Sequence, residues 1–221
     1  MAPSLPIREG EPPPDDAIVV IRAGVMAVPH IEHAATQCLE LRGVLAISVE
    51  AVLDTTVAEA CATSERLAQY RQVRLSSFGR LRAAGFALLP TFARPHFSLV
   101  LPDLAELTVA RLDRCFDPPI PKPGSAGVEV GLLCGGAMTT DAEYDIWVDF
   151  MSMMDDRRIW TRMRDVRPGF VPIAGQYAVV GCEDAFPAVA RIITVDIEQG
   201  IQLEVLKGEV AEHRHLLTAS S

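Results

Sequence analysis

Residues 117–137 read DPPIPKPGSAGVEVGLLCGGA, and this stretch divides the chain into two unlike parts. It opens with four prolines in seven residues and closes on glycines, a composition typical of a linker. We therefore predict a first domain over residues 17–117, a linker over 118–137 and a second domain over 138–221. A Pro-rich, acidic arm over residues 1–16 precedes them and is predicted to be disordered.

The first part alternates strand and helix patterns. Short apolar runs at residues 17–21 and 44–49 are typical of buried strands, and apolar residues recur at helical spacing between them. Thr56 and Glu59 have the spacing of a capping box, which predicts a helix that continues toward Tyr70. Further helices are predicted over residues 78–84 and 104–115, and strands over 86–89 and 97–101. These patterns indicate a small mixed α/β domain.

The second part changes period. Apolar and polar residues alternate over 144–150, as in a half-buried strand, and apolar runs follow at residues 177–181, 188–196 and 201–206. Residues 198–200 form a predicted hairpin turn, and a short polar helix is predicted over 210–217. The fold class is thus α+β or α/β, with a mixed α/β domain followed by a small antiparallel β-barrel-like domain.

The composition predicts a cytoplasmic protein. The chain has 221 residues, 49% of them hydrophobic, without an uncharged apolar run near the ~20 residues that span a membrane. Its start lacks the pattern of a signal peptide. Five widely spaced cysteines without a CxxC pair favour a reducing compartment. The basic residues are arginines except for Lys122 and Lys207, which together with abundant Ala and Val suggests a GC-rich bacterial genome.

A basic run lies in the first part. No acidic residue occurs between Glu65 and Asp103, whereas arginines alternate there with aromatic residues. Guanidinium groups bind phosphate oxygens and aromatic rings stack on bases, so this run predicts contact with a nucleotide or RNA. The candidate phosphate-binding residues are Arg71, Arg74, Arg80, Arg82 and Arg94. The alternative is that these arginines lie on solvated surfaces and pair with acids elsewhere in the chain.

The net charge of −9 is unevenly distributed. Residues 1–127 carry twelve basic and fourteen acidic side chains, whereas residues 128–221 carry eight basic and fifteen acidic ones. An acidic second part could lie on the basic run and mask it, as a built-in or cognate inhibitor would. The overall acidity disfavours constitutive nucleic-acid binding, because phosphates are repelled at long range.

His96 is the first candidate catalytic residue. It forms a His-x-Ser pattern with Ser98 on a predicted strand, and imidazole can serve as an acid or a base in phosphoester chemistry. Phosphoesterases that open cyclic phosphates use two such motifs, and this chain has one. A structural role at the start of a strand is therefore the alternative.

Arg22 and Glu50 are the other candidate catalytic residues. Arg22 ends the first predicted strand, and strand ends are where α/β folds gather ligands. This placement loosely resembles the strand-end arginine of ADP-ribosyl-transferring folds, which also use Ser and Glu side chains such as Ser48 and Glu50. Alternatively, Arg22 forms an ion pair with Glu50 or Asp54.

Known cofactor and metal motifs do not occur in the sequence. It contains no glycine-rich phosphate loop and no HExxH, and His30-x-x-His33 lacks a third ligand at a telling spacing. We therefore predict no metal and no cofactor. The sequence favours a two-module protein of toxin–antitoxin or phage-defence type, whose first module binds or acts on a nucleotide or RNA. The alternative is a non-enzymatic interaction or scaffolding protein.

Overall fold

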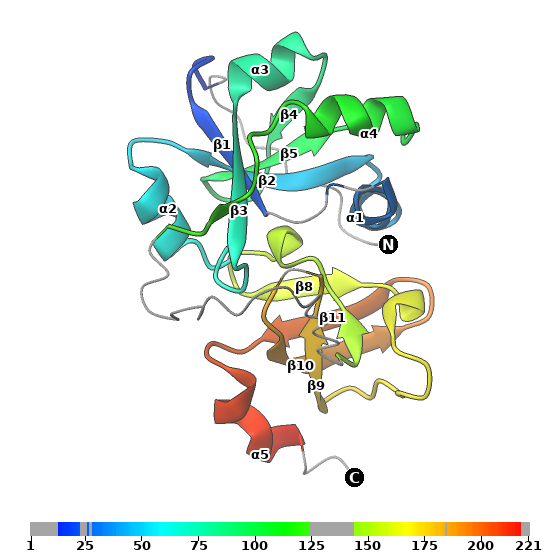
Figure 1. Ribbon diagram of the computed structural model, residues 1–221. Helices are drawn as coiled ribbons and strands as arrows, with labels where there is room; N and C mark the ends of the chain where they lie inside the picture. Colours follow the sequence, from blue (N-terminus) through cyan, green and yellow to red (C-terminus); the bar gives the residue numbers. More distant parts are fainter. Residues whose placement is uncertain (1–12, 23–25, 27, 124–143, 184, 218–221) are drawn as a thin grey trace, which may run out of the picture.

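The computed structural model describes residues 13–22, 26, 28–123, 144–183 and 185–217, although not the side chains of residues 20–22. The chain has a mixed α+β fold with two β-sheets, which lie one above the other in Figure 1. Each sheet is built almost entirely from one side of the predicted linker. None of the described helices is long and apolar enough to cross a membrane.

The first sheet is antiparallel and has the strand order β4-β5-β2-β1-β3-β6. Its strands are β1 (Ile18–Arg22), β2 (Ala46–Val52), β3 (Gln72–Ser77), β4 (Ala87–Pro90), β5 (His96–Val100) and β6 (Ile120–Pro121). Four helices belong to the same part: α1 (Val28–Arg42), α2 (Val57–Thr63), α3 (Phe78–Ala83) and α4 (Glu106–Asp113). Ile31 of α1 and Leu112 of α4 pack with Val49 and Phe97 in an apolar cluster on one face of this sheet.

The second sheet curls into a half-barrel with the order β7-β9-β10-β11-β8. Its strands are β7 (Ile146–Trp147), β8 (Arg158–Thr161), β9 (Tyr177–Gly181), β10 (Ala188–Asp196) and β11 (Gly200–Val205). Short helical turns η1 (Phe150–Ser152), η2 (Met163–Asp165) and η3 (Val210–His213) precede the C-terminal α5 (Arg214–Leu217). A bridge between Ile146 and Val166 draws the β7 edge toward the segment that follows β8.

Gly200 shows why the predicted hairpin turn needs a glycine. Its φ is +102°, and a Cβ atom at this position would lie 2.3 Å from the carbonyl oxygen of Thr161. The turn therefore permits β11 to pair closely with both β10 and β8.

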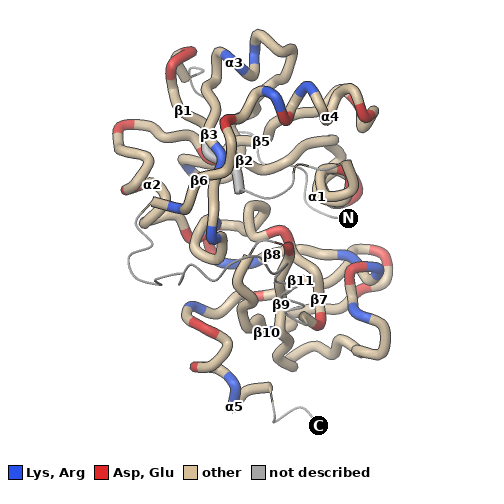
Figure 2. The backbone as a smooth tube through the Cα atoms, in the orientation of Figure 1, with Lys and Arg blue, Asp and Glu red and all other residues tan. Residues whose placement is uncertain are grey.

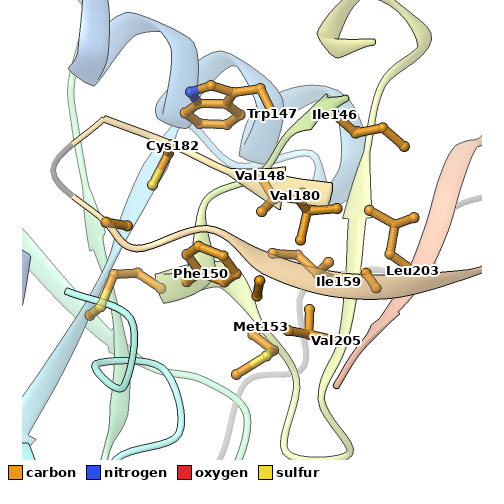
Figure 3. Close-up of a cluster of buried hydrophobic side chains, with 14 of the residues drawn as sticks. Ile146, Trp147, Val148, Phe150, Met153, Ile159, Val180, Cys182, Leu203 and Val205 are labelled. Carbon is orange, nitrogen blue, oxygen red and sulfur yellow. The ribbon is translucent and has the colours of Figure 1, made fainter. Parts of the chain in front are cut away.

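One hydrophobic core spans the predicted boundary between the parts. Leu67, Tyr70 and Val73 of the first part are buried in the same cluster as Phe150 and Leu203 of the second. Figure 3 shows the second-part members of this cluster converging from β7, β8, β9 and β11. Because buried apolar area is the main driving force for folding, the two sheets stabilise one another.

Most predicted elements are present, but strand β8 and the linker strand β6 were not predicted, and three further differences occur. The capping box of Thr56 and Glu59 is confirmed, but α2 ends at Thr63 rather than near Tyr70. Gln72–Ser77, for which no element was predicted, forms strand β3 between β1 and β6. The alternation over 144–150 yields only the two-residue β7, since Asp149 accepts a hydrogen bond from Met151 N and starts a helical turn.

Parts of the predicted arm and linker fall outside the described residues. Residues 1–12 of the arm and 124–137 of the linker are not described, nor are residues 138–143. Within the described part of the arm, the Asp15 carbonyl accepts a hydrogen bond from Gly79 N over 2.8 Å at the start of α3. The division into two domains stays a prediction.

Candidate functional site

Glu50 and His96 lie side by side on neighbouring strands. Their Cα atoms are register partners across β2 and β5, and Ser48 pairs with Ser98 in the same way. Cross-strand partners project from the same face of a sheet. This face is opposite the one formed by Val49, so it is turned toward the second sheet. The structure thus brings two of the three predicted catalytic residues together, but both are buried.

Glu50 belongs to a charge cluster that joins the two parts, in which Glu50 and Arg66 are buried and Asp155 is exposed. Arg66 lies with Nη1 3.4 Å from Glu50 Oε1 and with Nη2 2.7 Å from Asp155 Oδ1, and its Nε donates to the Met153 carbonyl over 2.6 Å. Burial raises the pKa of Glu50 above its ordinary value, while a hydrogen bond from Ser64 and the Arg66 charge oppose that shift. The sequence analysis did not identify Arg66 or Asp155 as a site residue.

His96 is part of a buried hydrogen-bond chain. Its Nδ1 lies 2.8 Å from Thr91 Oγ1, which in turn lies 2.9 Å from Ser98 Oγ. The ring also packs edge-on against Phe92 at a centroid distance of 4.9 Å. The His-x-Ser spacing predicted the proximity of Ser98, whereas Thr91 carried no signal in the sequence. This arrangement orients the imidazole inside the protein.

A cavity of about 350 Å³ lies at the end of β2, between α2 and the β4–β5 connection. Arg94 and Asp54 line it, together with three hydroxyl side chains. Its full lining is Ala51, Leu53, Asp54, Thr55, Ala60, Thr63, Ser64, Arg94 and Pro95. Because the Ser64 hydroxyl lies near Glu50 and favours the charged form of that carboxyl, which lowers its pKa, the cavity wall adjoins the charge cluster of Glu50 and Arg66.

The other candidate arginines have partners within the protein. Arg74 is buried and binds the Asp113 carboxylate and the carbonyl oxygens of Phe116 and Asp117. On the surface, Arg80 pairs with Asp117 over 2.7 Å and Arg82 pairs with Asp15. The Arg71 guanidinium lies 4.2 Å from the ring centroid of Phe186. Figure 2 shows basic segments on α3 and α4, interspersed on α4 with acidic ones.

Arg22 is described only in its backbone. The register places Val20 beside Glu50, so Arg22 follows two residues farther along β1 and pairs with Val73. Its side chain lies outside the described residues. Among the described side chains, Arg66 forms the ion pair with Glu50.

His30 and His33 approach acids of the second part. His33 Nε2 lies 3.0 Å from Asp165 Oδ1, and His30 Nδ1 lies 3.6 Å from Glu183 Oε2. Within the described ranges, no three His, Cys, Asp or Glu side chains are arranged to hold a metal ion. The histidines therefore join α1 to the second sheet.

Charge pairs cross between the parts in both directions. Asp155 is the second-part carboxylate that pairs with an arginine of the basic run, Arg66. Apart from the two histidine contacts of α1, the other cross-part ion pairs among the described residues place first-part acids on second-part bases: Glu40 with Arg162 and Arg164, and Glu65 with Arg157 and Lys207. Most of the described arginine and lysine pairs between the parts therefore do not involve the acidity of the second part.

Comparison with known proteins places the chain in no family. No protein-family model matches it, and no curated protein or solved structure is significantly similar to it.

Proposed function

We propose that the first part of this protein binds a small phosphate-bearing ligand through Arg94. Arg94 lines the cavity beside α2 and is exposed, and within the described part of the chain it pairs with no carboxylate. An arginine side chain offers a planar fork of donors that fits phosphate oxygens. This combination of a cavity and an available guanidinium is the observation that carries the proposal.

A small ligand is favoured over RNA. Arg74, Arg80 and Arg82 are engaged by acids of the same part. A nucleic-acid strand is held by several cations that neutralise successive phosphates, and a net charge of −9 opposes such binding. One available arginine at a cavity suits a single small anion better.

Binding is favoured over catalysis for this part. His96 and Glu50 are the candidate acid and base, yet both lie beneath the second sheet. A group that transfers protons to a substrate has to come within hydrogen-bond reach of it. Catalysis by these two residues would therefore require the second part to move away from the sheet.

The second part acts in this proposal as a cover for the polar face of the first sheet. Asp155 supports this role, since it binds Arg66 and accepts a hydrogen bond from Ala93 N over 3.2 Å, next to Arg94. A ligand-binding module covered by its own inhibitor within one chain would suit toxin–antitoxin or phage-defence biology.

The test is calorimetric titration of the full chain with inorganic phosphate and with ADP. Replacing Arg94 (Arg94→Gln) is expected to weaken binding at least about tenfold, the scale of one charge-assisted contact. Arg82→Gln is the matched control, because Arg82 is also a surface arginine but pairs with Asp15. Equal affinities of the two variants would overturn the proposal.

A non-enzymatic interaction protein is the second candidate. Val171 and Ile173, in the connection before β9, are 69% and 52% exposed. Exposed apolar neighbours are typical of contact surfaces. Self-association in sedimentation that disappears on combining Val171→Ser with Ile173→Ser would favour this candidate over ligand binding.

A further inference from the structure

Two hydroxyl groups of the cavity donate their hydrogens inside the protein. Thr55 Oγ1 donates to Glu59 Oε2 over 2.9 Å, and Thr63 Oγ1 donates to the Glu59 carbonyl over 2.8 Å. A hydroxyl has one hydrogen and two lone pairs. Both threonines can therefore offer a ligand only acceptor oxygens while these bonds persist.

Ser64 also uses a lone pair inside the protein, because its Oγ accepts a hydrogen bond from Leu67 N over 3.0 Å. Its hydroxyl lies near Glu50 and favours the charged form of that carboxyl, which opposes the rise in the pKa of Glu50. The two threonines are therefore the hydroxyl groups of the cavity whose hydrogens are engaged within the protein.

Asp54 adds a further acceptor to the same lining. It is exposed, and its carboxylate has no hydrogen-bond or ion-pair partner among the residues that the structure describes. Its φ is +57°, in the left-handed region that Asp and Asn tolerate better than most residues. Asp54 and Arg94 line one cavity without forming an ion pair, so it offers an anion-binding side and an acceptor side.

The remaining lining residues exclude stacking on a base. Ala51, Leu53, Ala60 and Pro95 are small or aliphatic, and no aromatic side chain belongs to the lining. The volume of about 350 Å³ is at the lower end of the range for small-molecule pockets, roughly 300–1,000 Å³. A single arginine also matches one phosphate group rather than a chain of phosphates.

From this donor and acceptor arrangement we infer that the ligand is a sugar monophosphate. Its phosphate lies on Arg94, and its hydroxyls donate to Asp54 and to the oxygens of Thr55 and Thr63. The inference rests on the proposed function and deepens it, because it assigns the part of the ligand that faces away from the phosphate. A nucleotide binds through its ribose phosphate, with the base outside the cavity.

Titration of the full chain with a series of probes tests the inference. Ribose 5-phosphate and AMP are expected to bind within about threefold of each other, and inorganic phosphate at least about tenfold more weakly, as expected when several hydrogen bonds are lost. AMP binding tenfold more tightly than ribose 5-phosphate would show that the base is recognised. Inorganic phosphate binding as tightly as ribose 5-phosphate would show that the sugar hydroxyls are not recognised. Either result overturns the inference.

Two further outcomes separate the inference from the proposed function. Phosphate binding that is lost in Arg94→Gln, with no gain from the sugar, leaves the proposed function standing and refutes the sugar monophosphate. Absence of binding to every phosphate probe refutes both. Tighter binding of glutamate than of ribose 5-phosphate would identify an ammonium as the donor and also overturn the inference.

Asp54→Asn gives a direct test of the acceptor side. Asn tolerates the same backbone region but replaces one acceptor oxygen with a donor nitrogen. Ribose 5-phosphate affinity is expected to fall about fivefold to tenfold, while inorganic phosphate affinity is unchanged or higher. Asp156→Asn is the control, since Asp156 is an exposed acid beside Arg158 and away from the lining. If Asp54→Asn lost affinity equally for ribose 5-phosphate and for inorganic phosphate, Asp54 would not be the acceptor of the sugar hydroxyls.

Discussion

Tyr70 Oη lies 3.1 Å from Asp149 Oδ1, in a buried contact between residues 79 positions apart on either side of the predicted linker. The same carboxylate oxygen accepts a hydrogen bond from Met151 N, which shapes the turn after β7. The bond therefore ties the segment before β3 to the start of the half-barrel. It also places a polar contact inside the apolar cluster that both parts share.

Tyr70→Phe removes this bond and leaves the ring in place. The variant is expected to lose about 1–2 kcal/mol of unfolding free energy, because Asp149 stays buried with one partner fewer. For a chain of this size the melting temperature falls by roughly 2–8 °C. Tyr144→Phe is the control, since its hydroxyl reaches the exposed Glu183 at 3.5 Å. Equal melting temperatures for wild type and Tyr70→Phe would show that the contact is not stabilising.

Among the acids between the two parts, Asp165 is expected to contribute most to the dependence of the unfolding free energy on pH. Although burial raises its pKa, the contact with His33 and the hydrogen bonds from Arg162 N and Thr161 outweigh burial and hold the pKa below the ordinary value. A lowered folded-state pKa contributes stability above the unfolded-state pKa, and this stability is lost as pH falls through the folded value. Asp165→Asn should cost about 3 kcal/mol at pH 7 and progressively less below pH 4, in denaturant titrations. A cost independent of pH would contradict this account.

Glu50 is expected to show the opposite pH dependence. Burial raises its pKa in the folded state above the ordinary 4.5, so the folded protein holds a proton that the unfolded chain releases. Its contribution to stability is therefore present below pH 4.5 and is lost as pH rises toward the folded value. The difference in unfolding free energy between wild type and Glu50→Gln should decrease over that range. A difference that increases with pH would indicate that Arg66 dominates instead.

The shared core predicts that the first part does not fold alone. Leu67, Tyr70 and Val73 would lose their cover in a fragment of residues 1–127. The fragment is expected to lack a cooperative thermal transition in circular dichroism, unless residues 138–221 are added. A well-folded fragment that binds RNA or arrests cell growth would instead support a separable module masked by its partner.

Sequence patterns predicted the strands and helices where local periodicity and packing agree. The run that became β1 starts with four apolar residues, β2, β10 and β11 are mostly apolar, and the Thr56–Glu59 capping box is a local hydrogen-bond pattern. Strand β3 was missed because Arg74 and polar residues interrupt it. Its side chains are satisfied by distant partners such as Asp113, which a local pattern cannot reveal.

The candidate site was predictable only in part. A His-x-Ser spacing and a strand glutamate indicated His96 and Glu50 as candidates, and in the fold these two residues are neighbours. The basic run included Arg94 but did not distinguish it from Arg74 or Arg82, because that distinction depends on which acid each arginine meets in space. Asp54 and the hydroxyls of Thr55 and Thr63 could be identified as acceptors for a ligand only from the hydrogen bonds in the structure.

The most direct test of ligand binding at Arg94 is a nuclear magnetic resonance titration of the full chain with ribose 5-phosphate. Saturable amide shifts are predicted to cluster at residues 54–64 and 93–94, to require at least about tenfold more ligand in Arg94→Gln and to be unchanged in Arg82→Gln. Shifts centred on residues 71–82, or no saturable shifts at all, would contradict the account.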